Sequence, residues 1–154
     1  MIRIEQILTP GRSQVNVPGG SKKRVLEQIA QLVAPDLSGL DQQQIFEALI
    51  ARERLGSTGF GNGIAIPHCR LAGCVEPISA LLHLDHAVDF DAIDGAPVDL
   101  LFVLLVPQEA TDEHLELLRQ IASMLDRKDI RESLRAATDS QALYQVVVNA
   151  QQGH

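Results

Sequence analysis

Residues 98–106 of the chain, VDLLFVLLV, form a nearly continuous apolar run that ends at Pro107. A run of this length without polar alternation is typical of a central strand that is buried on both faces. Two shorter apolar runs, Ile64–Ile66 and Ile78–Leu84, also predict strands. The link between these two is too short for a helical crossover, so we expect them to pair antiparallel. The stretch and its neighbours therefore predict a mixed sheet.

Helical patterns flank these strands on both sides along the chain. Ser21 and Asp41 are suitable helix N-caps, Gln44 completes a capping box with Asp41, and Gly56 is a suitable helix stop. Apolar residues at helical spacing predict helices from Ser21 to before Pro35, from Asp41 to Gly56, from Thr111 or Asp112 to about Leu125, near Ile130–Ala137 and near Ser140–Asn149. Residues 1–8 predict a short strand or lead-in, and residues 9–20 predict a loop. We expect one α/β domain over residues 1–154, with a mixed parallel/antiparallel sheet and helices on both faces.

The composition limits the classes of partner and the compartment. The net charge is −7 with histidine neutral, which disfavours a nucleic-acid backbone or an anionic membrane as the main partner. No segment approaches the roughly 18 apolar residues of a membrane span, and charges interrupt the first apolar stretch, unlike in a signal peptide. The two cysteines, Cys69 and Cys74, do not make a disulfide framework. We expect a cytoplasmic protein with reduced thiols and no membrane insertion.

The segment GNGIAIPHCR, Gly61–Arg70, places a histidine directly after a predicted strand and a proline. Pro67 fixes its own φ and has no backbone N–H, and His68 titrates near neutral pH. Small donors and flexible positions precede the strand: Ser57, Thr58, Gly59, Gly61, Asn62 and Gly63. On composition alone a plain turn explains these residues better than a site does. No nucleotide-binding glycine motif is present in its usual setting.

A second histidine, His114, falls in the first turn of the third predicted helix. With Thr111 as N-cap it takes the N3 position, where free backbone N–H groups disfavour the imidazolium and attract an anion. His68 and His114 both follow predicted strand ends, where sites in open α/β sheets gather, so we expect them at one rim. Arg52 ends the second helix, and a guanidinium there can bind phosphate oxygens or simply complement the helix dipole. The remaining histidines are interpreted as surface or rim residues: His83, His86 and His154.

The segment RERLGSTGFGNGIAIPHCRL, Arg52–Leu71, closely resembles the active-site segment of enzyme IIA proteins of the phosphoenolpyruvate phosphotransferase system. The match is to the nitrogen-regulatory branch, which is related to the mannitol and fructose IIA domains. SKKRVLEQIAQL, FDAIDGAPVDLLFVLLVP and LRAATDSQALYQ extend the resemblance over nearly the whole chain. Cys69 departs from the family, which often has glycine after the histidine.

The resemblance implies a role for each site residue. His68 is the phosphoryl acceptor through Nε2, His114 supports the phosphoryl group without carrying it, and Arg52 binds it. Ser57, Thr58 and Asn62 are expected to bring donors around the same group. No cofactor or metal is expected.

The resemblance also implies a relay. An HPr-like phosphocarrier donates the phosphoryl group, and the phosphorylation state signals to regulatory targets such as potassium-transport components or sensor kinases. We expect a monomer or weak dimer, with a fairly apolar rim around His68 to which Phe60 contributes.

Three other interpretations stay open at this point. A sugar-specific IIA component of the fructose or mannitol type, passing phosphate to a IIB domain, would share the same chemistry. A metal-binding module has the right ligand types in His68, Cys69, Cys74, His83 and His86, although their spacing matches no familiar zinc pattern. A structural interaction domain would carry no phosphoryl group at all.

Overall fold

The computed structural model describes residues 2–110 and 112–152. Its centre is a six-stranded mixed sheet in which β6 (Val98–Pro107) is the middle strand. The strand order is β1-β5-β6-β3-β2, and β4 also pairs with β6. The other strands are β1 (Ser13–Val17), β2 (Gly59–Gly61), β3 (Ile64–Ala65), β4 (His68–Leu71) and β5 (Ile78–Val88). The predicted mixed sheet is confirmed.

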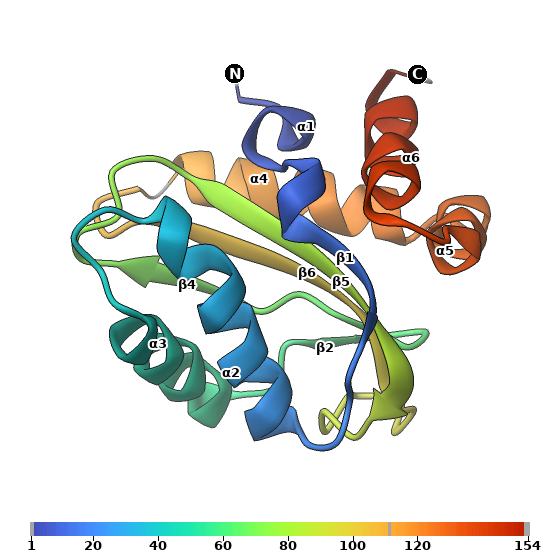
Figure 1. The fold of residues 1–154 in the computed structure, drawn as a ribbon, viewed down its shortest axis with the longest axis horizontal. Coiled ribbons are helices and arrows are strands. Elements are labelled where there is room, and N and C mark those ends of the chain that lie inside the picture. Colours follow the sequence, from blue (N-terminus) through green and yellow to red (C-terminus); the bar gives the residue numbers. More distant parts are fainter. Residues whose placement is uncertain (1, 111, 153–154) are drawn as a thin grey trace.

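Helices cover both faces of this sheet, as predicted (Figure 1). On one face lie α2 (Lys22–Val33) and α3 (Gln42–Leu55); the other face carries α1 (Ile4–Ile7), α4 (Asp112–Leu125), α5 (Lys128–Ala136) and α6 (Ser140–Gln152). Two short 3₁₀ turns, Pro10–Arg12 and Ala34–Asp36, complete the elements. Within the described residues, no helix is both long and apolar enough for a membrane crossing.

The apolar run of β6 is buried on both sides because its side chains alternate between two separate cores. Those packed with α2 and α3 are Leu101, Val103 and Leu105, and those packed with α1, α4, α5 and α6 are Leu100, Phe102, Leu104 and Val106. All seven are at most 1% exposed. A strand between two helical layers needs no polar face, which explains the missing alternation.

The predicted pairing of the two shorter strands is wrong. β3 and β5 lie on opposite sides of β6, with β3 parallel and β5 antiparallel to it. They do run in opposite directions, but they are not neighbours. The long apolar strand supplies two edges, and each shorter strand pairs with one of them.

The N-terminal expectations also need correction. Residues 4–7 form the helix α1, not a strand, and the predicted loop contains β1, which pairs parallel with β5. Its partner lies more than sixty residues away, so local sequence carried little signal for it. The helix caps behaved as predicted: Ser21 accepts from the N–H of Arg24, Asp41 and Gln44 form a capping box, and Gly56 ends α3. Thr111 lies outside the described residues.

Candidate functional site

The two histidines singled out in the sequence meet beside the C-terminal end of β6. His68 is the first residue of β4 and pairs with Leu104, whereas His114 is the third residue of α4. Their ring centroids are 5.7 Å apart and the ring planes are inclined at 77°. His68 follows the end of β3, as expected, and it also begins β4; only residues 66–67 separate these two strands, which both pair with β6. The expectation of a shared rim agrees with this placement.

One hydrogen bond sets the protonation pattern of His68. Its Nδ1 lies 2.6 Å from the carbonyl oxygen of Ile66, and a carbonyl can only accept, so Nδ1 carries the proton. In the neutral ring, Nε2 then holds the free lone pair. Burial lowers the pKa of His68, the bond to Ile66 opposes this, and the charge of Arg52 lowers the pKa further. The half-buried ring is therefore a neutral nitrogen nucleophile at pH 7.

His114 is more deeply buried and has a free ring nitrogen. The residue is 7% exposed, and its buried Nδ1 has no hydrogen-bond partner among the described residues. Its pKa is lowered first by burial and then by His68, Arg70 and Arg52. A buried polar atom without a partner is uncommon, and here it lies beside the nucleophilic ring.

A pocket of about 460 Å³ opens onto both histidines. Its walls come from the end of α3, from β4 and from the start of α4: Ala51, Arg52, Leu55, His68, Cys69, Arg70 and His114. Two guanidinium groups and two neutral imidazoles thus line it, and no carboxylate is among the lining residues. Such a surface suits a small anion.

Arg70 is a site residue that the sequence reasoning missed. It lies two residues after His68 on β4, and residues spaced by two on a strand point to the same side. That spacing was the available signal. Arg52, which was predicted, also lines the pocket, and its Nη1 donates to the carbonyl of Gly56 at 2.8 Å.

The structure does not bring the three predicted small donors to this pocket. Ser57 Oγ donates to the carbonyl of Phe90 at 2.5 Å, and the buried hydroxyl of Thr58 donates to Glu53. The backbone N–H of Asn62 donates to Asp94, and Asn62 precedes β3, which pairs near the opposite end of β6. These hydrogen bonds hold the glycine-rich loop in shape, so the positions do not support phosphoryl contacts.

The cysteines are buried thiols. Cys69 lines the pocket, and burial, with a smaller contribution from Cys74, raises its pKa to about 12. It therefore stays protonated and unreactive at neutral pH. Within residues 2–110 and 112–152, no group of three or more His, Cys, Asp or Glu side chains is arranged to hold a metal ion. His83 instead lies 3.3 Å from Asp99.

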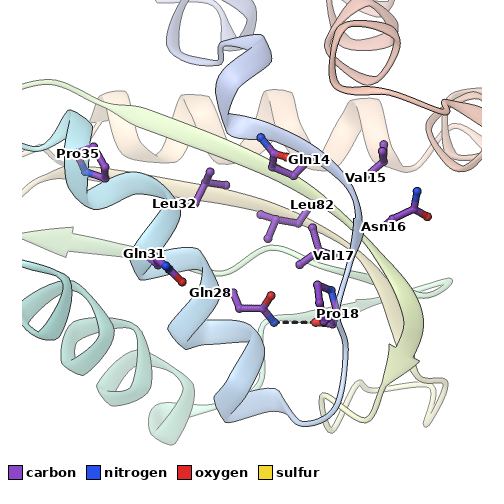
Figure 2. Close-up of a pocket in the computed structure, with 10 residues that line it drawn as sticks. All are labelled: Gln14, Val15, Asn16, Val17, Pro18, Gln28, Gln31, Leu32, Pro35 and Leu82. Atoms are coloured by element: carbon purple, nitrogen blue, oxygen red, sulfur yellow. Dashed lines mark hydrogen bonds between the residues drawn. The ribbon is translucent and has the colours of Figure 1, made fainter.

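A larger hollow of about 530 Å³ lies elsewhere, between β1 and α2 (Figure 2). Its polar side chains are uncharged amides, and Gln28 donates to the carbonyl of Pro18 at 2.7 Å. Among the described residues, no nucleophilic or titratable side chain lines it. Reactive groups gather at the smaller histidine pocket, which makes that pocket the candidate site.

Comparison with known proteins identifies the family. The model of the phosphoenolpyruvate-dependent sugar phosphotransferase system EIIA 2 family matches residues 6–150. The chain is 76% identical over 153 residues to the nitrogen regulatory protein of Pseudomonas aeruginosa, with 99% of each chain covered. The crystal structure of nitrogen regulatory protein IIA-Ntr from Neisseria meningitidis has a TM-score of 0.89 and 42% identity, covering 94% of this chain and 98% of that one.

A more distant relative is a longer protein. The fructose-specific EIIABC component of Bacillus subtilis is 30% identical over 146 residues, which covers 95% of this chain and 23% of that protein. The family match over residues 6–150 and the near-complete coverage of the two nitrogen regulatory relatives indicate the same family. The chain belongs to the EIIA 2 family of the phosphoenolpyruvate-dependent sugar phosphotransferase system.

Proposed function

We propose that this protein accepts a phosphoryl group on Nε2 of His68 from an HPr-like phosphocarrier, and that its phosphorylation state regulates other proteins. The observation that carries the proposal is the hydrogen bond from Nδ1 of His68 to the carbonyl of Ile66. It leaves Nε2 unprotonated on a ring that borders an anion-suited pocket. No metal or cofactor takes part in the proposed transfer.

The transfer is a displacement at phosphorus. The Nε2 lone pair of His68 forms the new N–P bond while the N–P bond to the carrier's histidine breaks, and that bonding pair returns to the carrier's ring nitrogen. Little covalent help is needed, because positioning and charge stabilisation dominate phosphoryl transfer. His114 donates a hydrogen bond to a phosphoryl oxygen, and Arg52 and Arg70 balance the added negative charge.

An apolar rim offers the docking surface for the carrier. Leu55 is 86% exposed at the pocket mouth, and Leu115, next to His114, is 59% exposed. Exposed apolar side chains around a polar centre are typical of protein contact sites. Phe60, expected at this rim, lies on β2, is 37% exposed and does not line the pocket.

The regulatory part rests on the relatives. The 76% identical protein is called a nitrogen regulatory protein, as is the structural relative at 42% identity. A phosphoryl group adds about −1.5 to −2 charges beside two arginines, which changes the charge of the face that a target would meet. Potassium-transport components and sensor kinases in the cytoplasm are candidate targets, met by a monomer or weak dimer.

The test is direct. Purified protein is incubated with phosphoenolpyruvate, enzyme I and an HPr-type carrier, and its intact mass is measured before and after mild acid. We expect an acid-labile gain of one phosphoryl group in wild type and in His86→Ala, whose imidazole is exposed, and no gain in His68→Ala. Equal labelling of wild type and His68→Ala would refute the site.

A second candidate function is a sugar-specific IIA component that passes phosphate to a IIB domain. The similarity to part of a fructose-specific component favours it. Deletion of the gene followed by growth on fructose or mannitol separates the two functions. A growth defect specific to one sugar would support the transport role, and normal growth with altered nitrogen or potassium responses would support the regulatory role.

A further inference from the structure

Glu53 is a buried carboxylate that the proposed transfer does not use. It lies in α3 next to Arg52, and the residue is only 9% exposed. Burying a carboxylate is costly unless it is paired and hydrogen-bonded. Both conditions hold here, and one partner of Glu53 is connected to His68 through further hydrogen bonds.

The cationic partner is Lys22 at the start of α2. Its Nζ lies 2.7 Å from Oε2 of Glu53 and 3.7 Å from the exposed carboxylate of Asp91. The Nζ also donates to the carbonyl of Phe90 at 3.4 Å. Lys22 thus joins α2 to α3 and to the loop of residues 89–91, and its positive charge offsets the buried negative charge of Glu53.

The other side of Glu53 holds the glycine-rich loop. The backbone N–H of Thr58 lies 3.2 and 3.3 Å from the two carboxylate oxygens, and its hydroxyl donates to the same carboxylate. The carbonyl of Thr58 accepts from the N–H of Ile66 at 2.9 Å. The carbonyl of Ile66 accepts from Nδ1 of His68 at 2.6 Å. Three successive contacts thus join the buried carboxylate to the nucleophilic ring.

We propose that Glu53 is a positioning residue that, through Thr58 and Ile66, holds His68 in the tautomer with the proton on Nδ1. A ring nitrogen is protonated or not according to the hydrogen bond made by the other. If Thr58 is released, Ile66 loses the bond that fixes its orientation, and its carbonyl no longer selects Nδ1–H. The proton then also occupies Nε2, and the nucleophilic lone pair is lost from the side that faces the pocket. The consequence for transfer rests on the proposed function; the consequence for the tautomer does not.

Two variants of Glu53 separate this role from a general structural one. Glu53→Ala and Glu53→Gln both remove the ion pair to Lys22, but only the glutamine keeps an oxygen that can accept from Thr58. We expect both variants to have a lower Tm. The tautomer is measured by ¹⁵N NMR of the His68 ring at about pH 8, where histidine is neutral, in protein that carries no phosphoryl group.

The expected result is a clear difference between the two variants. Glu53→Ala populates the Nε2–H tautomer and accepts the phosphoryl group at least about tenfold more slowly in kcat, while Glu53→Gln stays close to wild type in both. Retention of the Nδ1–H tautomer in folded Glu53→Ala would overturn the proposal. If Glu53→Ala does not fold, Glu53→Leu fills most of the same volume without an acceptor for Thr58, and retention of the Nδ1–H tautomer in that variant would overturn the proposal equally.

The readouts also keep the two proposals apart. A tautomer change in Glu53→Ala supports the positioning role even if the wild type takes no label, a result that would refute only the phosphoryl transfer. Lys22→Met serves as a control, because it breaks the ion pair and leaves the contacts from Glu53 to Thr58 in place. We expect a lower Tm there and an unchanged tautomer.

Discussion

The two ends of the central strand β6 both border histidines, but the charges around these histidines are balanced at one end and positive at the other. Near its start, His83 lies 3.3 Å from Asp99, and Arg135 lies 2.8 Å from the same carboxylate. Beside its C-terminal end, His68 and His114 share a pocket whose charged lining residues are both arginines. The first cluster contains its own anion. The second has two arginines and no carboxylate among its lining residues, an arrangement that suits the proposed phosphoryl acceptor.

The sharpest way to test this comparison is to remove one histidine from each end. His68→Ala should lose all acid-labile phosphorylation, because the only proposed nucleophile is gone. His83→Ala should be labelled at the wild-type rate. Intact-mass measurement over time decides between them, and loss of label in both variants would remove the distinction between the two ends.

The supporting histidine should have the next largest effect. His114→Ala removes one donor to the phosphoryl oxygens, and the rate of acceptance should fall by about 10² to 10³, as for a lost oxyanion donor. At the other end of β6, Asp99→Asn weakens the cluster of His83, Asp99 and Arg135. It should lower Tm by a few degrees without changing the rate of phosphoryl acceptance. A rate in His114→Ala equal to that of wild type would contradict the proposed support.

The apolar rim offers a smaller and purely docking effect. Leu55→Glu places a charge at the pocket mouth and should raise KM for the phosphorylated carrier about tenfold with little change in kcat. Ile93→Glu is the matched control, since Ile93 is 92% exposed but does not line the pocket. Equal KM values for the two variants would show that the carrier docks elsewhere.

The smallest effect is on stability as a function of pH. The titratable groups at the two ends of β6 change the free energy of unfolding over different pH ranges. Burial lowers the pKa of both His68 and His114, so below the ordinary value of 6.5 the unfolded chain binds more protons than the folded one. The free energy of unfolding should therefore fall as pH drops below about 6.5, and level off below the folded pKa values.

Burial alone would raise the pKa of Asp99, but His83 and Arg135 outweigh the effect of burial and lower the pKa. Its contribution is present above the ordinary 3.8 and lost at lower pH.

Urea unfolding between about pH 5 and pH 7.5 measures the histidine contribution. A double variant with His68→Gln and His114→Gln should show a shallower dependence on pH than wild type, by at most about one proton per histidine. His83→Gln serves as the control in the same range. Parallel curves for wild type and the double variant would contradict the lowered pKa values.

Much of the framework was accessible from contiguous residues. The stretch VDLLFVLLV is apolar at every position except Asp99, and its lack of alternation indicates burial on both faces, so it predicted a central strand between helical layers. Ser21 and Asp41 cap helices with groups three residues away, and such short-range signals are readable from sequence. The family resemblance identified His68, His114 and Arg52, which the structure brings to one pocket.

Other features depended on partners far away in the chain. Strand β1 exists because β5 pairs with it, and Ser57 is held by Phe90, 33 residues away. Asn62 is likewise held by Asp94, 32 residues away, whereas Thr58 is held by Glu53, only five residues before it; none of the three small donors lines the pocket where the sequence had suggested them. Local periodicity and capping are properties of neighbouring residues, so the sequence by itself determined the layers, the central strand and the two histidines. The bond from Nδ1 of His68 to the carbonyl of Ile66 spans only two residues, but no sequence pattern predicts it, because it depends on how the chain folds between β3 and β4. The grouping of Arg70 and Leu55 around His68 joins β4 to the end of α3, and therefore only the tertiary structure decided it.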